Sequence, residues 1–288
     1  MAAFRCRTMR TLAGFFVVAA TLGASADVVT QATSLYDRTR YEDSLRVLAQ
    51  DTAPDAADYL LTGKNHFMLG DYKKAVDFFE KVLAVTPRSS EAELWLGRAW
   101  GRRAESSAMA IVYAGRAREA FEKAVTFDPH NREAKNDLFD FYLNAPGVLG
   151  GGVDKAEAAA RGIATERPAE FEFEEAQIAE KRNDSAGAEK HLRRAVELAP
   201  GEPGRLVDLA RWLARHGHLA ESDRLFEEAE KLAPGKPGVI FAEAKTDIEN
   251  HRNADKARRL LQSYLQAILT PDDPPRQEAE KLLRRVSQ

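Results

Sequence analysis

The chain has 288 residues, of which 44% are hydrophobic and 30% charged, a composition typical of soluble globular proteins. Its formal net charge of −3 gives no positive field that would attract nucleic acid or an anionic membrane surface. The single cysteine, Cys6, excludes an intramolecular disulfide.

Residues 1–26 have the pattern of a secretory signal peptide. Three arginines precede an apolar run from Thr11 to Ala24, and Ala24-Ser25-Ala26 supplies the small residues of a cleavage site. The run is shorter than the roughly 20 residues that span a bilayer, which argues against an uncleaved anchor. We therefore expect a mature chain that begins at Asp27, is periplasmic or secreted, has no stable membrane insertion and contains no thiol.

Residues 27–55 predict a first pair of helices. Ala32 and Tyr36 can face inward on one helix, and Leu45 and Leu48 on a second, shorter one. This unit matches the later ones only weakly. Because a terminal unit has water on one side, we interpret it as an N-terminal cap.

The segment 56–89 has the clearest pattern. Small, aromatic and proline residues stand at fixed places of a unit about 34 residues long. They are Tyr59, Gly63, Gly70, Tyr72, Ala75, Phe79, Val82 and Pro87. The pattern predicts a helix, a tight turn at residues 69–71 and a second helix, and it strongly resembles a tetratricopeptide repeat (TPR).

The next two units, 90–131 and 132–168, each contain an insertion. Eight extra residues separate Trp100 from Ala117, close to two helical turns, so each helix can gain one turn and keep its inner face in phase. The tip of this longer hairpin would contain some of Met109, Ile111, Val112 and Tyr113. The second insertion, at residues 144–152, is rich in glycine. Turns inside such units lie on one edge, so we expect the two insertions side by side.

The units 169–202, 203–236 and 237–269 complete the array. The first two end in Ala-Pro-Gly, where proline prevents the helix from continuing, and the third has one extra residue near Asn253. Residues 270–288 begin with a proline-rich break. They predict a C-terminal capping helix with Leu282, Leu283 and Val286 on one face.

The resemblance to TPR proteins covers nearly all of residues 27–269. It implies an all-α fold, a right-handed α-solenoid of about seven TPR-like helix pairs with a C-terminal capping helix. In TPR proteins the first helices of successive units line a concave groove that takes a peptide or protein. Transferred to this chain, that geometry and the hairpin edge indicate these partner-binding residues: Lys64, Phe67, Met68, Leu94, Arg98, Arg102, Asn136, Asp140, Phe173, Gln177, Arg211, Arg215, Phe241, Lys245 and Tyr113.

No cofactor or metal site is expected. Gly147 and Gly152 have the spacing of the outer glycines of a P-loop, but Val153-Asp154 stands where Lys and Ser/Thr are needed. His216 and His218 lack further ligands at usual spacing. The glutamates around Phe171 and Phe173 are interpreted as a charged surface beside a packed ring. They are Glu170, Glu172, Glu174 and Glu175.

These observations favour an exported, non-catalytic scaffold that binds a protein or peptide partner through its groove and the adjacent edge. A rival is an enzyme, or an accessory subunit of one, acting on cell-envelope polymer, motivated by Asp140, Glu170 and Glu180. It would need a deep cleft with two convergent, partly buried carboxylates. A structural spacer within an envelope complex is a third hypothesis, and the partner's identity and the oligomeric state stay open.

Overall fold

The computed structural model describes residues 17–105 and 107–286, with side chains from Asp27 onward. These residues form fifteen α-helices and one short 3-10 helix, and no strand occurs among them. The elements are α1 (Val17–Tyr36), α2 (Tyr41–Leu48), α3 (Ala56–Met68), α4 (Tyr72–Val85), α5 (Ser90–Ala104), α6 (Ala110–Phe127), α7 (Arg132–Asn144), η1 (Gly147–Leu149), α8 (Val153–Arg161), α9 (Pro168–Lys181), α10 (Ser185–Leu198), α11 (Pro203–Arg215), α12 (Leu219–Leu232), α13 (Pro237–Glu249), α14 (Ala254–Gln266) and α15 (Arg276–Val286).

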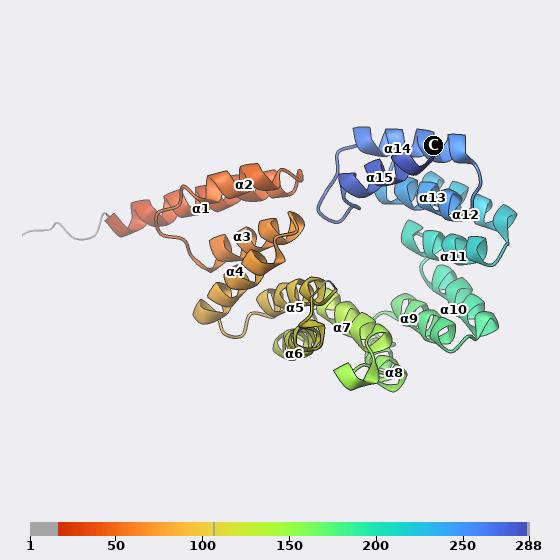
Figure 1. Cartoon of the computed structure of the whole chain (residues 1–288), viewed down its shortest axis with the longest axis horizontal. Coiled ribbons are helices and arrows are strands. Elements are labelled where there is room, and N and C mark those ends of the chain that lie inside the picture. Colours follow the sequence, from red (N-terminus) through yellow and green to blue (C-terminus); the bar gives the residue numbers. More distant parts are fainter. Residues whose placement is uncertain (1–16, 106, 287–288) are drawn as a thin grey trace, which may run out of the picture.

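Consecutive helices pack as antiparallel pairs, from α1 with α2 to α13 with α14. First helices of neighbouring pairs are also in contact, α3 with α5 and α5 with α7, and they form an inner layer. Figure 1 shows the pairs following an arc, with α15 packed at its end. The predicted solenoid of seven helix pairs with a capping helix is confirmed.

Most of the predicted signal peptide, residues 1–16, lies outside the described residues. Helix α1 continues through the expected cleavage point after Ala26, and Ala32 and Tyr36 in its second half are buried against Leu48. The partner helix α2 has only 8 residues, consistent with a short capping pair. Export itself stays a prediction.

Short polar side chains fix where many helices begin. The carboxylate of Asp55 accepts hydrogen bonds from the backbone N–H groups of Ala57 and Asp58, and Asp58 accepts one from the N–H of Asp55, forming a capping box. Four other starts are capped by Asp71, Ser89, Asn131 and Asp184. Three helices instead have proline in the first turn: Pro168, Pro203 and Pro237.

Glycine allows the two helices of a pair to approach closely. A Cβ on Gly63 would lie 2.5 Å from the ring of Phe79, and one on Gly97 would lie 2.6 Å from the ring of Phe121. Both rings are buried. The glycine and the phenylalanine that recur in the repeat pattern therefore contact each other, and the same contact occurs in two successive units.

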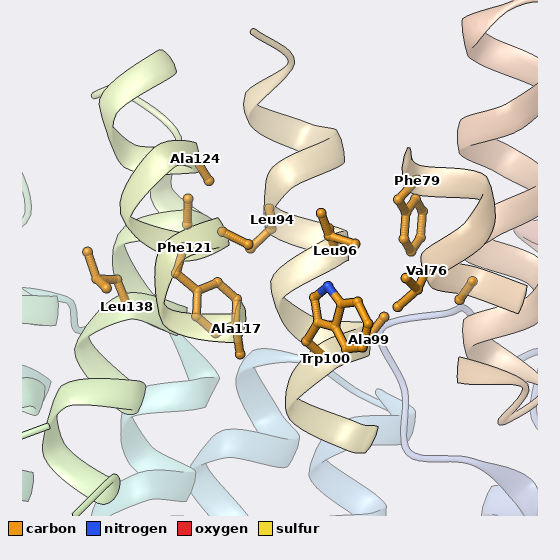
Figure 2. Close-up of a cluster of buried hydrophobic side chains, with 13 residues drawn as sticks. Val76, Phe79, Leu94, Leu96, Ala99, Trp100, Ala117, Phe121, Ala124 and Leu138 are labelled. Atoms are coloured by element: carbon orange, nitrogen blue, oxygen red, sulfur yellow. The ribbon is translucent and has the colours of Figure 1, made fainter. Parts of the chain in front are cut away.

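The largest buried cluster joins units two, three and four. Figure 2 shows Phe79 of α4, Trp100 of α5 and Phe121 of α6 directed between the helices, with Leu138 of α7 at the far side. Because each unit shares its apolar face with its neighbours, the core continues along the array and does not form one centre.

Both insertions are placed as expected. Helices α5 and α6 have 15 and 18 residues, against 13 and 14 in the preceding pair, and Ile111 at their tip is 72% exposed. The glycine-rich loop contains η1, which touches α6, and Arg118 donates a hydrogen bond to the carbonyl of Leu149 (3.4 Å). Together they form one edge of the solenoid.

The seventh unit departs from the repeat pattern at a buried aspartate and at the turn between its two helices. Asp247, which stands where many units have a large apolar residue, is fully buried. It pairs with Arg252 (2.8 Å), which also binds Asp223 of the preceding unit (2.7 Å). His251 and Asn253 have positive φ angles, and they accommodate the extra residue at the turn.

Candidate functional site

The arc encloses a concave space, the central cavity, of about 1090 Å³. Helices α1, α3, α5 and α7 supply one wall, and the loop from Pro271 to Pro275 supplies the opposite side. In Figure 1 this loop, just before α15, lies across from the α1–α2 pair. Burial raises the pKa of Tyr41 to about 12, and the Asp272 carboxylate across the gap adds to the shift.

Eleven of the predicted partner-binding residues lie on two concave surfaces. Seven line the central cavity: Lys64, Phe67, Met68, Leu94, Arg98, Arg102 and Asp140. Four line a smaller hollow of about 130 Å³ between α9 and α11: Phe173, Gln177, Arg211 and Arg215. Whether these residues bind a partner stays a prediction.

The remaining predicted residues are engaged within the protein. Phe241 is buried and packs on Tyr264, with ring centroids 5.1 Å apart, so it belongs to the core and offers no groove surface. Asn136 accepts a hydrogen bond from Arg167 (2.9 Å), and Lys245 pairs with Glu278 of α15 (3.0 Å). Tyr113 packs on Trp100 and accepts a hydrogen bond from Arg103, beside the hairpin tip. Leu94, although it reaches the cavity, is also almost fully buried.

The sequence prediction missed several residues of the cavity wall. Glu91, Trp95, Arg98 and Arg102 follow one another at intervals of four, three and four residues, which places them along one face of α5. Only the last two were predicted. Extending the same spacing toward the start of the helix finds the others, and on α7 it finds Glu133 and Asp137 ahead of Asp140. The sequence predicts a break from Pro271 to Pro275, but nothing in it indicates that this loop faces the cavity.

The cationic side chains of the cavity are held by ion pairs. Lys64 pairs with Glu91, and Arg102 pairs with Glu105 (2.9 Å). Arg98 pairs with both Asp137 (2.5 Å) and Glu133 (2.9 Å) on α7.

Lys64 and Arg98 also lie over the ring of Trp95, at 5.3 and 4.8 Å from its centroid. These pairs join α3, α5 and α7 across unit boundaries. Arg98 is thus a structural link as well as a wall residue.

Carboxyl groups form a continuous series from α7 to α11, here called the acidic series. Its members are Asp137, Asp140, Glu170, Glu174 and Asp208. Burial raises the pKa of Asp140 to about 6, and the neighbouring Asp137 and Glu170 carboxylates add to it. Arg167 (3.2 Å) and Arg205 (2.5 Å) hold Glu170.

Glu174 is the most enclosed member of the acidic series. Its side chain is 2% exposed, and its Oε2 atom has no hydrogen-bond partner within the described part of the chain. Burial raises its pKa to about 8, and the charge of Glu170 adds to the shift. The prediction that Glu174 belongs to a charged surface is therefore wrong, because it packs inward between the first helices.

Of the three carboxylates that motivate the enzyme hypothesis, Asp140, Glu170 and Glu180, only Asp140 lines the central cavity. Asp140 faces the cavity, but Glu174 is closed off from it and Glu170 is held by two arginines. Glu180 pairs with Arg215 (2.9 Å) near the end of α9. The described residues contain no group of three or more His, Cys, Asp or Glu side chains arranged to hold a metal ion.

The glycine-rich loop and the two histidines have structural roles. Gly150 and Gly152 have φ angles of +89° and +143°, which side-chain-bearing residues rarely adopt, and the N–H of Gly152 donates to the carbonyl of Tyr142 (2.7 Å). The loop is thus a long turn between α7 and α8. His216 stacks on Trp212 with ring centroids 3.8 Å apart, and His218 precedes α12.

Comparison with known proteins supports the fold. No family model matches the sequence, and no curated protein does. Among solved structures, a tetratricopeptide repeat protein from Parabacteroides merdae aligns with 92% of this chain and 100% of its own, at a TM-score of 0.59 and 11% identity. A thermophilic TPR protein from Thermus thermophilus aligns with 66% of this chain and 99% of its own, at a TM-score of 0.53 and 19% identity.

These likenesses show that the chain has the TPR fold, an all-α array of paired helices. At such low identity they show the fold alone. None of the helices in the described residues is both long enough and apolar enough to span a membrane.

Proposed function

We propose that this chain is a non-catalytic scaffold that binds a protein or peptide partner in its central cavity. The observation that supports this most directly is the cavity itself, lined by four successive units. Its volume, about 1090 Å³, lies at the upper end of the roughly 300–1,000 Å³ of small-molecule sites. An extended segment of several residues fits such a space better than a small ligand does.

The wall of the cavity is organised to bind rather than to react. Phe67 packs edge-on against both Tyr72 and Trp95, with ring centroids 5.3 Å apart in each pair, so these rings are fixed before a partner arrives. Rigid aromatic surface of this kind gives contact area at a small cost in conformational entropy. Met68 adds a flexible apolar side chain beside them.

We also propose that the protein is exported. This rests on the sequence of residues 1–26, with its basic start, short apolar run and Ala24-Ser25-Ala26 site. The described fold is compatible with removal of that segment, because the described side chains of α1 that pack in the first cluster, Ala32 and Tyr36, lie after Ala26. N-terminal sequencing of the protein from its own cells checks this, and an intact N-terminus would contradict it.

Site-specific photocrosslinking tests the scaffold function. A benzoylphenylalanine in place of Met68 lies in the cavity, and the same group in place of Glu119, which is exposed on α6, is the matched control. We expect the Met68 position to give a crosslinked partner in an extract of the source cells and the Glu119 position to give none. Crosslinking from Glu119 alone, or from neither position, would contradict a partner in the cavity.

A further inference from the structure

The central cavity has a large excess of negative charge. Nine carboxylates and three cationic side chains line it. All three cations are already paired with carboxylates of the wall, Lys64 with Glu91, Arg98 with Glu133 and Asp137, and Arg102 with Glu105. Among the described residues that line it, the cavity therefore offers a ligand unpaired carboxylates and no unpaired cationic side chain.

Five carboxylates of the cavity have no cationic partner among the described residues, and they lie on opposite sides of it. Asp37 directly follows α1, Asp140 lies on α7, and Asp272 lies in the loop between α14 and α15. All three residues line the cavity. A ligand between these walls would meet negative charge from both directions.

The negative potential extends behind the cavity wall, to a buried group that does not itself line the cavity. Glu174 is 2% exposed, with an unpartnered Oε2, and its electrostatic neighbours include Asp140 on the cavity wall. A cation placed near Asp140 would reduce the negative potential that acts on both groups. The raised pKa values of Asp140 and Glu174 have the same origin, burial together with a negative potential that the nearby arginines do not cancel.

The loop that completes the cavity is held in place. The Tyr264 hydroxyl donates a hydrogen bond to the carbonyl of Pro274, and Arg276 donates to the carbonyls of Leu265 (2.5 Å) and Ala267 (2.9 Å). Prolines at positions 271, 274 and 275 restrict its backbone further. Asp272 is thus presented from a fixed position.

We infer that the central cavity takes an extended polypeptide segment in which lysine or arginine residues alternate with apolar ones. The inference rests on the proposed scaffold function and specifies the chemistry of its partner. Cationic side chains would reach Asp37, Asp140 and Asp272, while apolar ones would pack on Phe67, Met68 and Trp95. The alkyl stems of lysine and arginine suit this mixed surface as well.

Fluorescence anisotropy with synthetic decapeptides tests the inference. The probe alternates lysine with leucine or alanine, and its control replaces every lysine with glutamate. The protein variants are Asp140→Asn with Asp272→Asn in the cavity, and Asp77→Asn with Glu80→Gln at exposed positions of α4. Both variants remove two negative charges, so they have the same net charge, and circular dichroism checks that both are folded.

We expect the lysine peptide to bind, the cavity variant to lose at least tenfold in affinity, and the α4 variant to lose less than twofold. An equal loss in both variants would show non-specific attraction and overturn the inference, as would equal binding of the glutamate peptide. Full displacement by spermidine at the peptide's own concentration would also overturn it, since any small polycation would then suffice. If photocrosslinking at Met68 succeeds while the lysine peptide fails to bind, the scaffold function stands and only the partner chemistry is wrong.

Discussion

The buried carboxyl group of Glu174 should make the stability of the array depend strongly on pH. Its pKa in the folded chain is about 8, against 4.5 for an ordinary glutamate. Because the folded state holds the proton more tightly, the group's contribution to the free energy of unfolding is fully present below pH 4.5 and is lost as pH rises to 8. At about 1.4 kcal/mol per pKa unit, the whole shift corresponds to about 5 kcal/mol.

The substitution Glu174→Gln isolates this effect, since glutamine resembles the protonated glutamate and does not ionise. We expect the variant to gain stability relative to the wild type as pH rises, with the difference in unfolding free energy growing by about 3 kcal/mol between pH 5.5 and 8.5. Urea unfolding followed by far-UV circular dichroism at both pH values measures it. Glu280→Gln, at an exposed position of α15, is the control and should show no such trend.

A difference between Glu174→Gln and the wild type that stays constant across this pH range would refute the reasoning. It would mean that water or a cation reaches Glu174 in solution and that its ionised form is tolerated. A loss of stability in the variant at pH 5.5 alone would instead show that the protonated carboxyl makes a hydrogen bond that the amide cannot replace, and the pH trend would still decide the origin of the shift.

Three further predictions concern the packing of the array. Gly63→Ala should lower the free energy of unfolding by about 1–3 kcal/mol, because its new methyl group meets the Phe79 ring. Gly101→Ala, with open space around it inside α5, should instead be neutral or raise it by up to about 1 kcal/mol, because alanine favours a helix interior over glycine; urea midpoints distinguish them. Arg252→Ala should cost about 3–5 kcal/mol in the same assay, since it leaves Asp247 buried without its partner, and the added change Asp247→Asn should recover part of the loss. Gly152→Ala should cost about 1–3 kcal/mol because its φ angle of +143° strains any residue with a Cβ, and an unchanged thermal midpoint would show that the loop relaxes.

Much of the fold could be predicted because its determinants are local and recur. Gly63 and Phe79 stand at the same two places as Gly97 and Phe121, so one contact repeats and fixes the pairing of two helices. The repeat pattern also predicted the long α5–α6 hairpin. Eight added residues are close to two helical turns, so the inner face of each helix stays in phase.

The binding surface was only partly predictable. Helical spacing predicts which side chains share one face of α5 or α7. The prediction followed steps of four residues from Leu94 on α5 and from Asn136 on α7, and therefore omitted Trp95 and Asp137. The position of Asp272 could not be predicted, because it depends on small packing rotations accumulated over seven helix pairs. The burial of Glu174 was missed for a related reason, since a glutamate in a charged run gives no sign that its neighbours on α7 and α11 will enclose it.

The position of the loop from Pro271 to Pro275, across from the first helix pairs, fixes how many units this architecture can have. An ordinary repeat array tolerates the gain or loss of a unit, because each contacts only its neighbours. Here a missing unit would swing Asp272 away from Tyr36 and Tyr41, and an added one would carry it past them. The number of units between the first helix pair and this loop therefore determines whether the loop can complete the central cavity.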